Sequence, residues 1–146
     1  MYTSKKSAKL TMLLTCIFCV LLLIIMVMAR PALIWFFGGK RMDIIKTILT
    51  AFYICCPAAW IALGGIMGLL VNIIKEKIFV TRNVTYMRVL SWCCAFVSIV
   101  CLIFGFMYVP FFIVALSAGF MTLILRVLKN VMARATEIQN ENDLTI

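Results

Sequence analysis

The fold is decided by residues 10–29, which read LTMLLTCIFCVLLLIIMVMA and contain no charged side chain. Coiled as an α-helix, about 20 residues span about 30 Å, the thickness of the hydrocarbon core of a bilayer. The alternative is a cleaved signal peptide, whose apolar region is shorter, about 7–15 residues. Apolar residues also resume after Arg30 and Pro31, through Trp35. We therefore expect a retained transmembrane helix that bends or ends near Pro31.

Three further apolar runs extend this pattern along the chain, and the turn between the first two is predicted at Gly38, Gly39, Lys40 and Arg41. The second run contains Pro57, which removes a backbone hydrogen bond and bends a helix. The third and fourth runs meet at Pro110 with no charge between them, which predicts an antiparallel hairpin. The chain is predicted to be a single all-α domain over residues 1–146, a four-transmembrane-helix bundle. We expect helices at about residues 10–30, 44–74, 89–109 and 111–139, and a tail at 140–146.

The composition agrees with a membrane protein. Hydrophobic residues make up 66% of the chain, against about 45–50% in soluble domains. The formal net charge is +9, which in a soluble protein would suggest nucleic acid as a partner. Here the basic residues lie at the ends of the apolar runs, where lipid headgroups meet them. We therefore expect membrane lipid as a partner and no direct contact with nucleic acid.

The basic residues also predict the orientation in the membrane. Most of the 14 Lys and Arg residues fall on the side that holds both termini and the central loop, and that side is expected to be cytoplasmic. We therefore predict a multi-pass membrane protein, with the fourth helix extended into the cytoplasm. The basic residues on this side are Lys5, Lys6, Lys9, Lys75, Lys77, Arg82, Arg88, Arg126, Lys129 and Arg134.

The residues needed for catalysis are scarce. The chain has no His, and its acidic residues all lie outside the predicted hydrocarbon core. Proton-coupled transport needs an ionisable group near mid-membrane, and hydrolysis needs a base beside its nucleophile. The sequence therefore predicts no enzyme, no catalytic residue, no cofactor and no metal ion.

The seven cysteines all lie inside the apolar runs. Cys16 and Cys19 form a C-x-x-C, and Cys93 and Cys94 could lie at a similar depth in the membrane. Together they could form a thiolate metal site or a redox pair. Thiols in apolar surroundings resist ionisation, and the thiolate is the form that binds a metal. We favour reduced thiols that act as small apolar side chains.

Small residues recur four positions apart in three of the predicted helices. Gly64 and Gly68 form a G-x-x-x-G, and the same spacing separates Ser91 from Ala95 and Ala115 from Gly119. Such residues allow close approach of helix backbones in a membrane. Two interpretations follow: packing within the chain, which we favour, or a homo-oligomer formed through the second helix.

The end of the fourth run carries an apolar stripe with the spacing of a helix face. This stripe either covers the cytoplasmic end of the bundle itself or binds a helix of a soluble partner. Its residues are Ile124, Leu128, Val131, Ala135 and Ile138.

Two short segments resemble a known family. Residues 77–88 read KIFVTRNVTYMR and are similar to an "iFt-x-eNV-x-x-LR" signature, whereas residues 141–146 read ENDLTI. Both resemble the bacterial domain-of-unknown-function family 2975, small four-helix membrane proteins found mainly in Firmicutes. The resemblance implies that the chain is a multi-pass protein of the bacterial plasma membrane. Met87 replaces the usual Leu, and Arg82 stands where an acidic residue is common. The resemblance implies a layout rather than an activity, although members are often encoded beside a small helix-turn-helix regulator.

The two segments also predict a cytoplasmic surface. Thr81 or Asn83 is a suitable cap for a short helix that leads into the third run. The basic residues of the loop are expected to bind either the acidic residues of the tail or phosphate groups. We predict a partner surface formed by the loop residues Phe79, Arg82, Asn83 and Arg88 and the tail residues Glu141, Asn142 and Asp143.

The expected function is a non-enzymatic membrane sensor or regulator that presents this surface to a protein partner, with a helix-turn-helix regulator as the candidate. The first alternative is a small channel or transporter, formed as a homo-oligomer. The second alternative is an immunity or envelope-stress protein.

Overall fold

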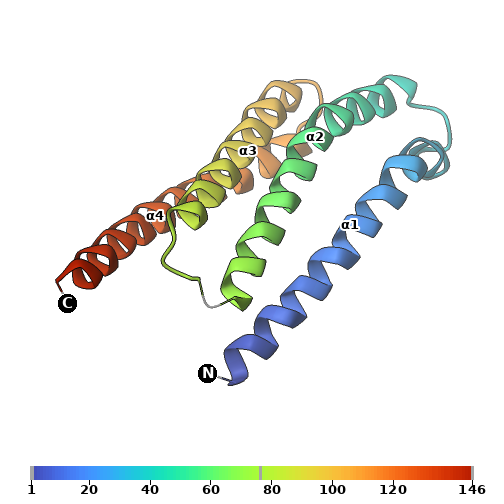
Figure 1. The fold of residues 1–146 in the computed structure, drawn as a ribbon. Coiled ribbons are helices and arrows are strands. Elements are labelled where there is room, and N and C mark those ends of the chain that lie inside the picture. The colour runs from blue at the N-terminus through green and yellow to red at the C-terminus, as the bar shows by residue number, and fades with distance from the viewer. Residues whose placement is uncertain (1, 76, 146) are drawn as a thin grey trace.

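The computed structural model describes the backbone of residues 2–75 and 77–145, and the side chains of these ranges from residue 6 onward. This part of the chain folds into four α-helices, which are coloured along the chain in Figure 1. Each helix is long and apolar enough to cross a membrane, as predicted. The helices are α1 (Tyr2–Phe37), α2 (Met42–Ile74), α3 (Thr81–Gly105) and α4 (Pro110–Leu144).

The helices form an open row rather than a closed bundle (Figure 1). Among the described residues, α1 contacts α2, α2 contacts α3, and α3 has its most extensive contact with α4. No contact joins α1 to α4 in the described part of the chain. Lipid solvates apolar helix faces that water would force together, so a membrane helix does not have to be enclosed on every side.

Two tight turns at the same end of the row reverse the chain, as predicted. Gly38 and Gly39 take left-handed φ values of 59° and 68°, a conformation that costs glycine nothing because it has no Cβ. The second turn, at residues 106–109, leads into α4, whose first residue is Pro110. Proline suits this position because the first amide of a helix has no helical acceptor.

Both internal prolines lie within continuous helices. Helix α1 continues through Pro31 to Phe37, and α2 continues through Pro57. A hydrogen bond from Tyr53 Oη of α2 to the Met26 carbonyl of α1, 3.0 Å long, links the first two helices. Of the bend or end predicted near Pro31, the end is wrong, because α1 continues as a helix through the proline to Phe37.

Helix α3 begins earlier than the apolar pattern suggests. Its first residue is Thr81 rather than about residue 89, so most of the KIFVTRNVTYMR segment is helical. Val80 is the N-cap, and no side chain caps this end. The expected cap by Thr81 or Asn83 is therefore wrong, because the side chain of Asn83 bonds to the preceding loop instead.

Helix α4 extends past its neighbour. Ser98 Oγ donates to the Ala115 carbonyl at 2.8 Å, and Ser91 Oγ donates to the Thr122 carbonyl at 3.4 Å. This antiparallel register places Thr81 level with about residue 132, so about 12 residues of α4 project roughly 18 Å beyond α3. The projection is the red end of the ribbon in Figure 1, and helix continues to Leu144 through most of the expected tail.

Candidate functional site

The end of the molecule that holds the α2–α3 loop contains a buried amide at its centre. Asn83 is 1% exposed. Its Nδ2 donates to the carbonyls of Lys77 and Ile78 at 3.0 and 2.8 Å, and its Oδ1 accepts from Asn72 Nδ2 at 2.8 Å. We call these four residues the Asn83 junction.

The Asn83 junction supplies the hydrogen bonds that the loop lacks. Residues 77–80 form neither helix nor strand, so their carbonyls need other partners when they are shielded from water. The backbone adds a bond from the Lys77 amide to the Asn72 carbonyl at 2.9 Å. Because Asn83 is enclosed by these bonds, we assign it to support of the loop rather than to contact with a partner.

The other predicted loop residues lie at the surface. Phe79 is 44% exposed, and Arg82 and Arg88 are exposed as well. The register places Arg88 level with Arg126 of α4, two turns inside α3. Phe79 and Arg82 therefore stay available at the loop end, whereas Arg88 lies farther along α3, at the level of Arg126.

The predicted tail residues Glu141, Asn142 and Asp143 are exposed on the last turn of α4. Thr145 closes this turn locally, since its Oγ1 donates to the Glu141 carbonyl at 2.6 Å. Within the described residues, no hydrogen bond or ion pair joins these tail residues to the loop residues. The structure thus brings both segments to one end of the molecule (Figure 1) without the loop–tail contact that the charges suggested.

The projecting part of α4 has two different faces. Thr136 is 5% exposed, and the register places it opposite the α2–α3 loop. Val131 and Ile138, on the predicted apolar stripe, are 59% and 58% exposed. They line a shallow groove of about 460 Å³ together with Arg134 and its neighbours. The stripe therefore faces away from the row of helices instead of covering its end.

Two of the three glycines of α2 face α3, and the third faces outward. A Cβ on Gly68 would lie 2.7 Å from Tyr86 Cζ, and one on Gly65 would lie 2.8 Å from Leu90 Cδ1, so both glycines pack against α3. A Cβ on Gly64 would meet nothing within 4 Å. The G-x-x-x-G pair is thus divided: Gly68 serves packing within the chain, and Gly64 lies on an open surface.

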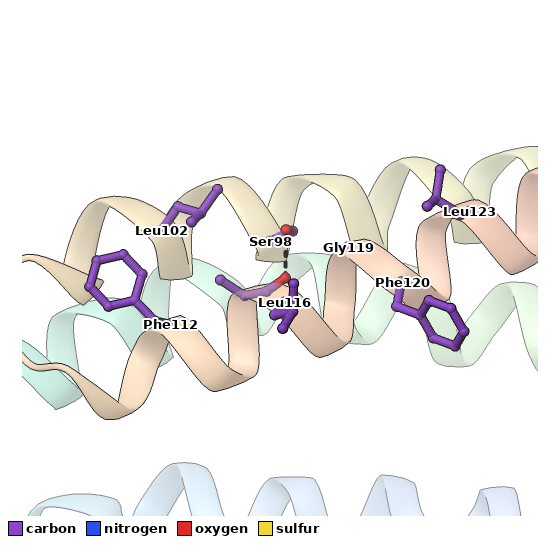
Figure 2. Close-up of a pocket in the computed structure, with 8 residues that line it drawn as sticks. Ser98, Leu102, Phe112, Leu116, Gly119, Phe120 and Leu123 are labelled. Atoms are coloured by element: carbon purple, nitrogen blue, oxygen red, sulfur yellow. Dashed lines mark hydrogen bonds between the residues drawn. The ribbon is translucent and has the colours of Figure 1, made fainter.

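The small residues of α4 form the contact with α3. Ala115 is 1% exposed and accepts the Ser98 hydrogen bond, which Figure 2 shows as a dashed line between the two helices. A Cβ on Gly119 would lie 3.2 Å from Ser98 Oγ. An apolar groove of about 610 Å³ runs along this contact, with Phe112 and Leu123 near its ends (Figure 2).

The sequence did not predict the partners of three residues at this end of the molecule. Tyr86 packs on Gly68, Asn72 bonds to Asn83, and the Arg126 guanidinium lies 5.7 Å from the centre of the Trp92 ring. An asparagine near the end of an apolar run was a usable signal for Asn72, because membrane helices seldom leave such an amide unpaired. The described residues contain no group of three or more His, Cys, Asp and Glu side chains that could hold a metal ion.

Comparison with known proteins identifies a matching family. Residues 2–146, nearly the whole chain, match the model of a family described as "Protein of unknown function (DUF2975)". Neither a curated protein nor a solved structure matches the chain.

Proposed function

We propose that this chain, which belongs to the DUF2975 family, is a non-enzymatic bacterial membrane regulator that presents the loop and the end of α4 to a cytoplasmic protein partner. The cytoplasmic side follows from the excess of basic residues at this end of the chain. The observation that carries the proposal is the exposed apolar stripe on the projecting part of α4.

The position of Ile138 supports the proposal. Arg126 ends the uncharged part of α4 and marks the headgroup level, since a cation at the edge of an apolar run extends toward the lipid phosphates. Ile138 lies about 18 Å farther along the helix, whereas the headgroup layer is only about 5–8 Å thick. Its 58% exposed side chain therefore meets water in the isolated chain, and a partner helix in the groove would remove that contact.

The charge around the stripe indicates the kind of partner. Glu137, Glu141 and Asp143 are all exposed on the projecting turns, and no ion pair holds them in the described part of the chain. An acidic helix end favours a basic surface on the partner. A small helix-turn-helix regulator, the candidate that the family resemblance indicated, has a basic surface because it binds DNA.

The test is crosslinking from native membranes followed by identification of the captured proteins. The intact chain should recover a cytoplasmic DNA-binding protein. A chain that lacks residues 139–146 and an Ile138→Asp variant should both lose it, because one removes the acidic turns and the other places a charge in the groove. The matched control Ile138→Leu should retain capture. Equal capture by all four chains would contradict the proposal.

A second candidate function is a homo-oligomeric channel or transporter. The observation that favours it is the open surface at Gly64, on a row of helices that leaves both of its faces uncovered. Gly64→Leu should abolish crosslinks between copies of the chain without loss of the fold. Gly68→Leu is the contrasting variant, since it would collide with Tyr86 inside the chain. Self-crosslinks that survive Gly64→Leu would count against this candidate.

A further inference from the structure

A cluster of cations lies on the α3–α4 surface at the edge of the apolar region. Arg88 of α3 and Arg126 and Lys129 of α4 line one groove of about 360 Å³, together with Ser91 and other residues. The α3–α4 register puts the two arginines at the same level. No acidic side chain lines the groove, and no ion pair neutralises these cations among the described residues. The groove therefore holds uncompensated positive charge at the depth of lipid phosphates.

An aromatic ring lies at the boundary of this groove. Trp92 is 63% exposed, and the Arg126 guanidinium lies 5.7 Å from the ring centre. A cation over an indole face is attracted to it, so the ring orients Arg126 without neutralising its charge. Tryptophan is also common at the membrane interface, where one part of the ring meets headgroups and the other meets acyl chains.

The polar groove continues into an apolar one. Arg88 and Trp92 also line a second groove of about 470 Å³ between α2 and α3, whose wall includes Pro57, Ile61 and Phe96. From Arg88 to Phe96 this groove follows α3 for about 12 Å, in the direction of the membrane centre. The lining is almost wholly apolar and fits the first part of an acyl chain.

We infer that the two grooves together bind one anionic phospholipid. Its phosphate and headgroup would lie on Arg88, Arg126 and Lys129, and one acyl chain would lie along α2 and α3. An anionic lipid is favoured over a zwitterionic one because the three cations have no acidic neighbour in the groove. A lipid is favoured over free phosphate because the apolar groove is continuous with the polar one. The inference rests on membrane insertion and not on the partner proposed above.

The experiment measures quenching of Trp92 fluorescence by lipid. A full-length Trp35→Phe/Trp60→Phe background leaves Trp92 as its single indole. The protein is reconstituted in phosphatidylcholine vesicles that contain increasing fractions of phosphatidylglycerol with brominated acyl chains, or brominated phosphatidylcholine as the reference. Half-maximal quenching should need a several-fold smaller fraction of brominated phosphatidylglycerol than of brominated phosphatidylcholine.

Charge variants separate a built site from the general surface potential. Arg126→Gln should reduce the preference for phosphatidylglycerol roughly fivefold, the loss expected for one cation near an anionic headgroup. Arg126→Lys should keep most of it and shows that the loss is one of charge rather than of folding. Lys9→Gln is the matched control, since it removes one charge from the same end of the molecule, on α1 away from the groove.

Three results would overturn the inference. The first is equal quenching by the two brominated lipids. The second is an equal loss of preference in Lys9→Gln and Arg126→Gln, which would assign the effect to the overall positive charge. The third is release of the quenching by excess inorganic phosphate, which would assign the cations to a soluble anion.

Discussion

The two segments by which the chain resembles its family have opposite structural roles. The loop segment, residues 77–88, contains the buried side chains of Asn83 and Val84 and takes part in three side-chain hydrogen bonds of the Asn83 junction. The tail segment, residues 141–146, is exposed over its described part and is closed only by bonds within its own last turn. The difference teaches that a family signature can mark a support for the fold in one place and a free surface in another.

The largest expected effect is on Asn83. Asn83→Leu leaves the amide of Asn72 and two loop carbonyls without partners, and an unpaired buried polar group costs about 1–3 kcal/mol. We expect a loss of roughly 2–4 kcal/mol in the free energy of unfolding, measured by detergent-induced unfolding in mixed micelles. The control Asn142→Leu, in the tail segment, should change this free energy by less than about 0.5 kcal/mol. Equal losses would remove the contrast between the two segments.

The next effect concerns the contact between Gly68 and Tyr86, which anchors the loop segment on α2. In Gly68→Ala the new Cβ would lie 2.7 Å from Tyr86 Cζ, so the ring or the helix must shift. Overpacking of this kind costs about 1–3 kcal/mol. Gly64→Ala is the control, because its Cβ meets open space. Equal unfolding free energies for the two variants would show that α2 and α3 do not pack as described.

A smaller loss of stability is expected when an ordinary hydrogen bond between two helices is removed. Ser98→Ala removes the hydrogen bond to the Ala115 carbonyl at the α3–α4 contact. Such bonds between membrane helices are worth about 0.6 kcal/mol on average. The same unfolding measurement should therefore place Ser98→Ala well below Asn83→Leu. A loss as large as that of Asn83→Leu would mean that the Asn83 junction has no special weight in the fold.

The smallest effect on stability is expected from removal of residues 141–146. The described side chains of this segment are exposed, so the unfolding free energy should change by less than about 0.5 kcal/mol. Capture of the protein partner should nevertheless be lost. A truncated chain that unfolds far more easily would show that the tail supports the fold, as the loop segment does.

The sequence by itself determined that the chain forms four membrane-spanning helices and where its two tight turns lie. Uncharged runs of about 20 residues have few alternatives to a transmembrane helix, because the backbone must satisfy its own hydrogen bonds in lipid. Gly38 and Gly39 marked one turn through the conformations open to glycine, and Pro110 marked the start of α4. These signals are local, so they can be recognised in the sequence without knowing how the helices pack against one another.

Only the tertiary structure decided which residues meet. The helices are apolar on most sides, so the pattern did not show that Gly68 faces α3 while Gly64 faces outward. It also did not show that α3 begins at Thr81, because a polar segment resembles a loop until partners for its side chains are known. Asn83 is inside because the Asn72 amide and two loop carbonyls meet there. Lipid removes the periodicity that would reveal helix faces in a soluble protein, and polar contacts between distant residues supply that information instead.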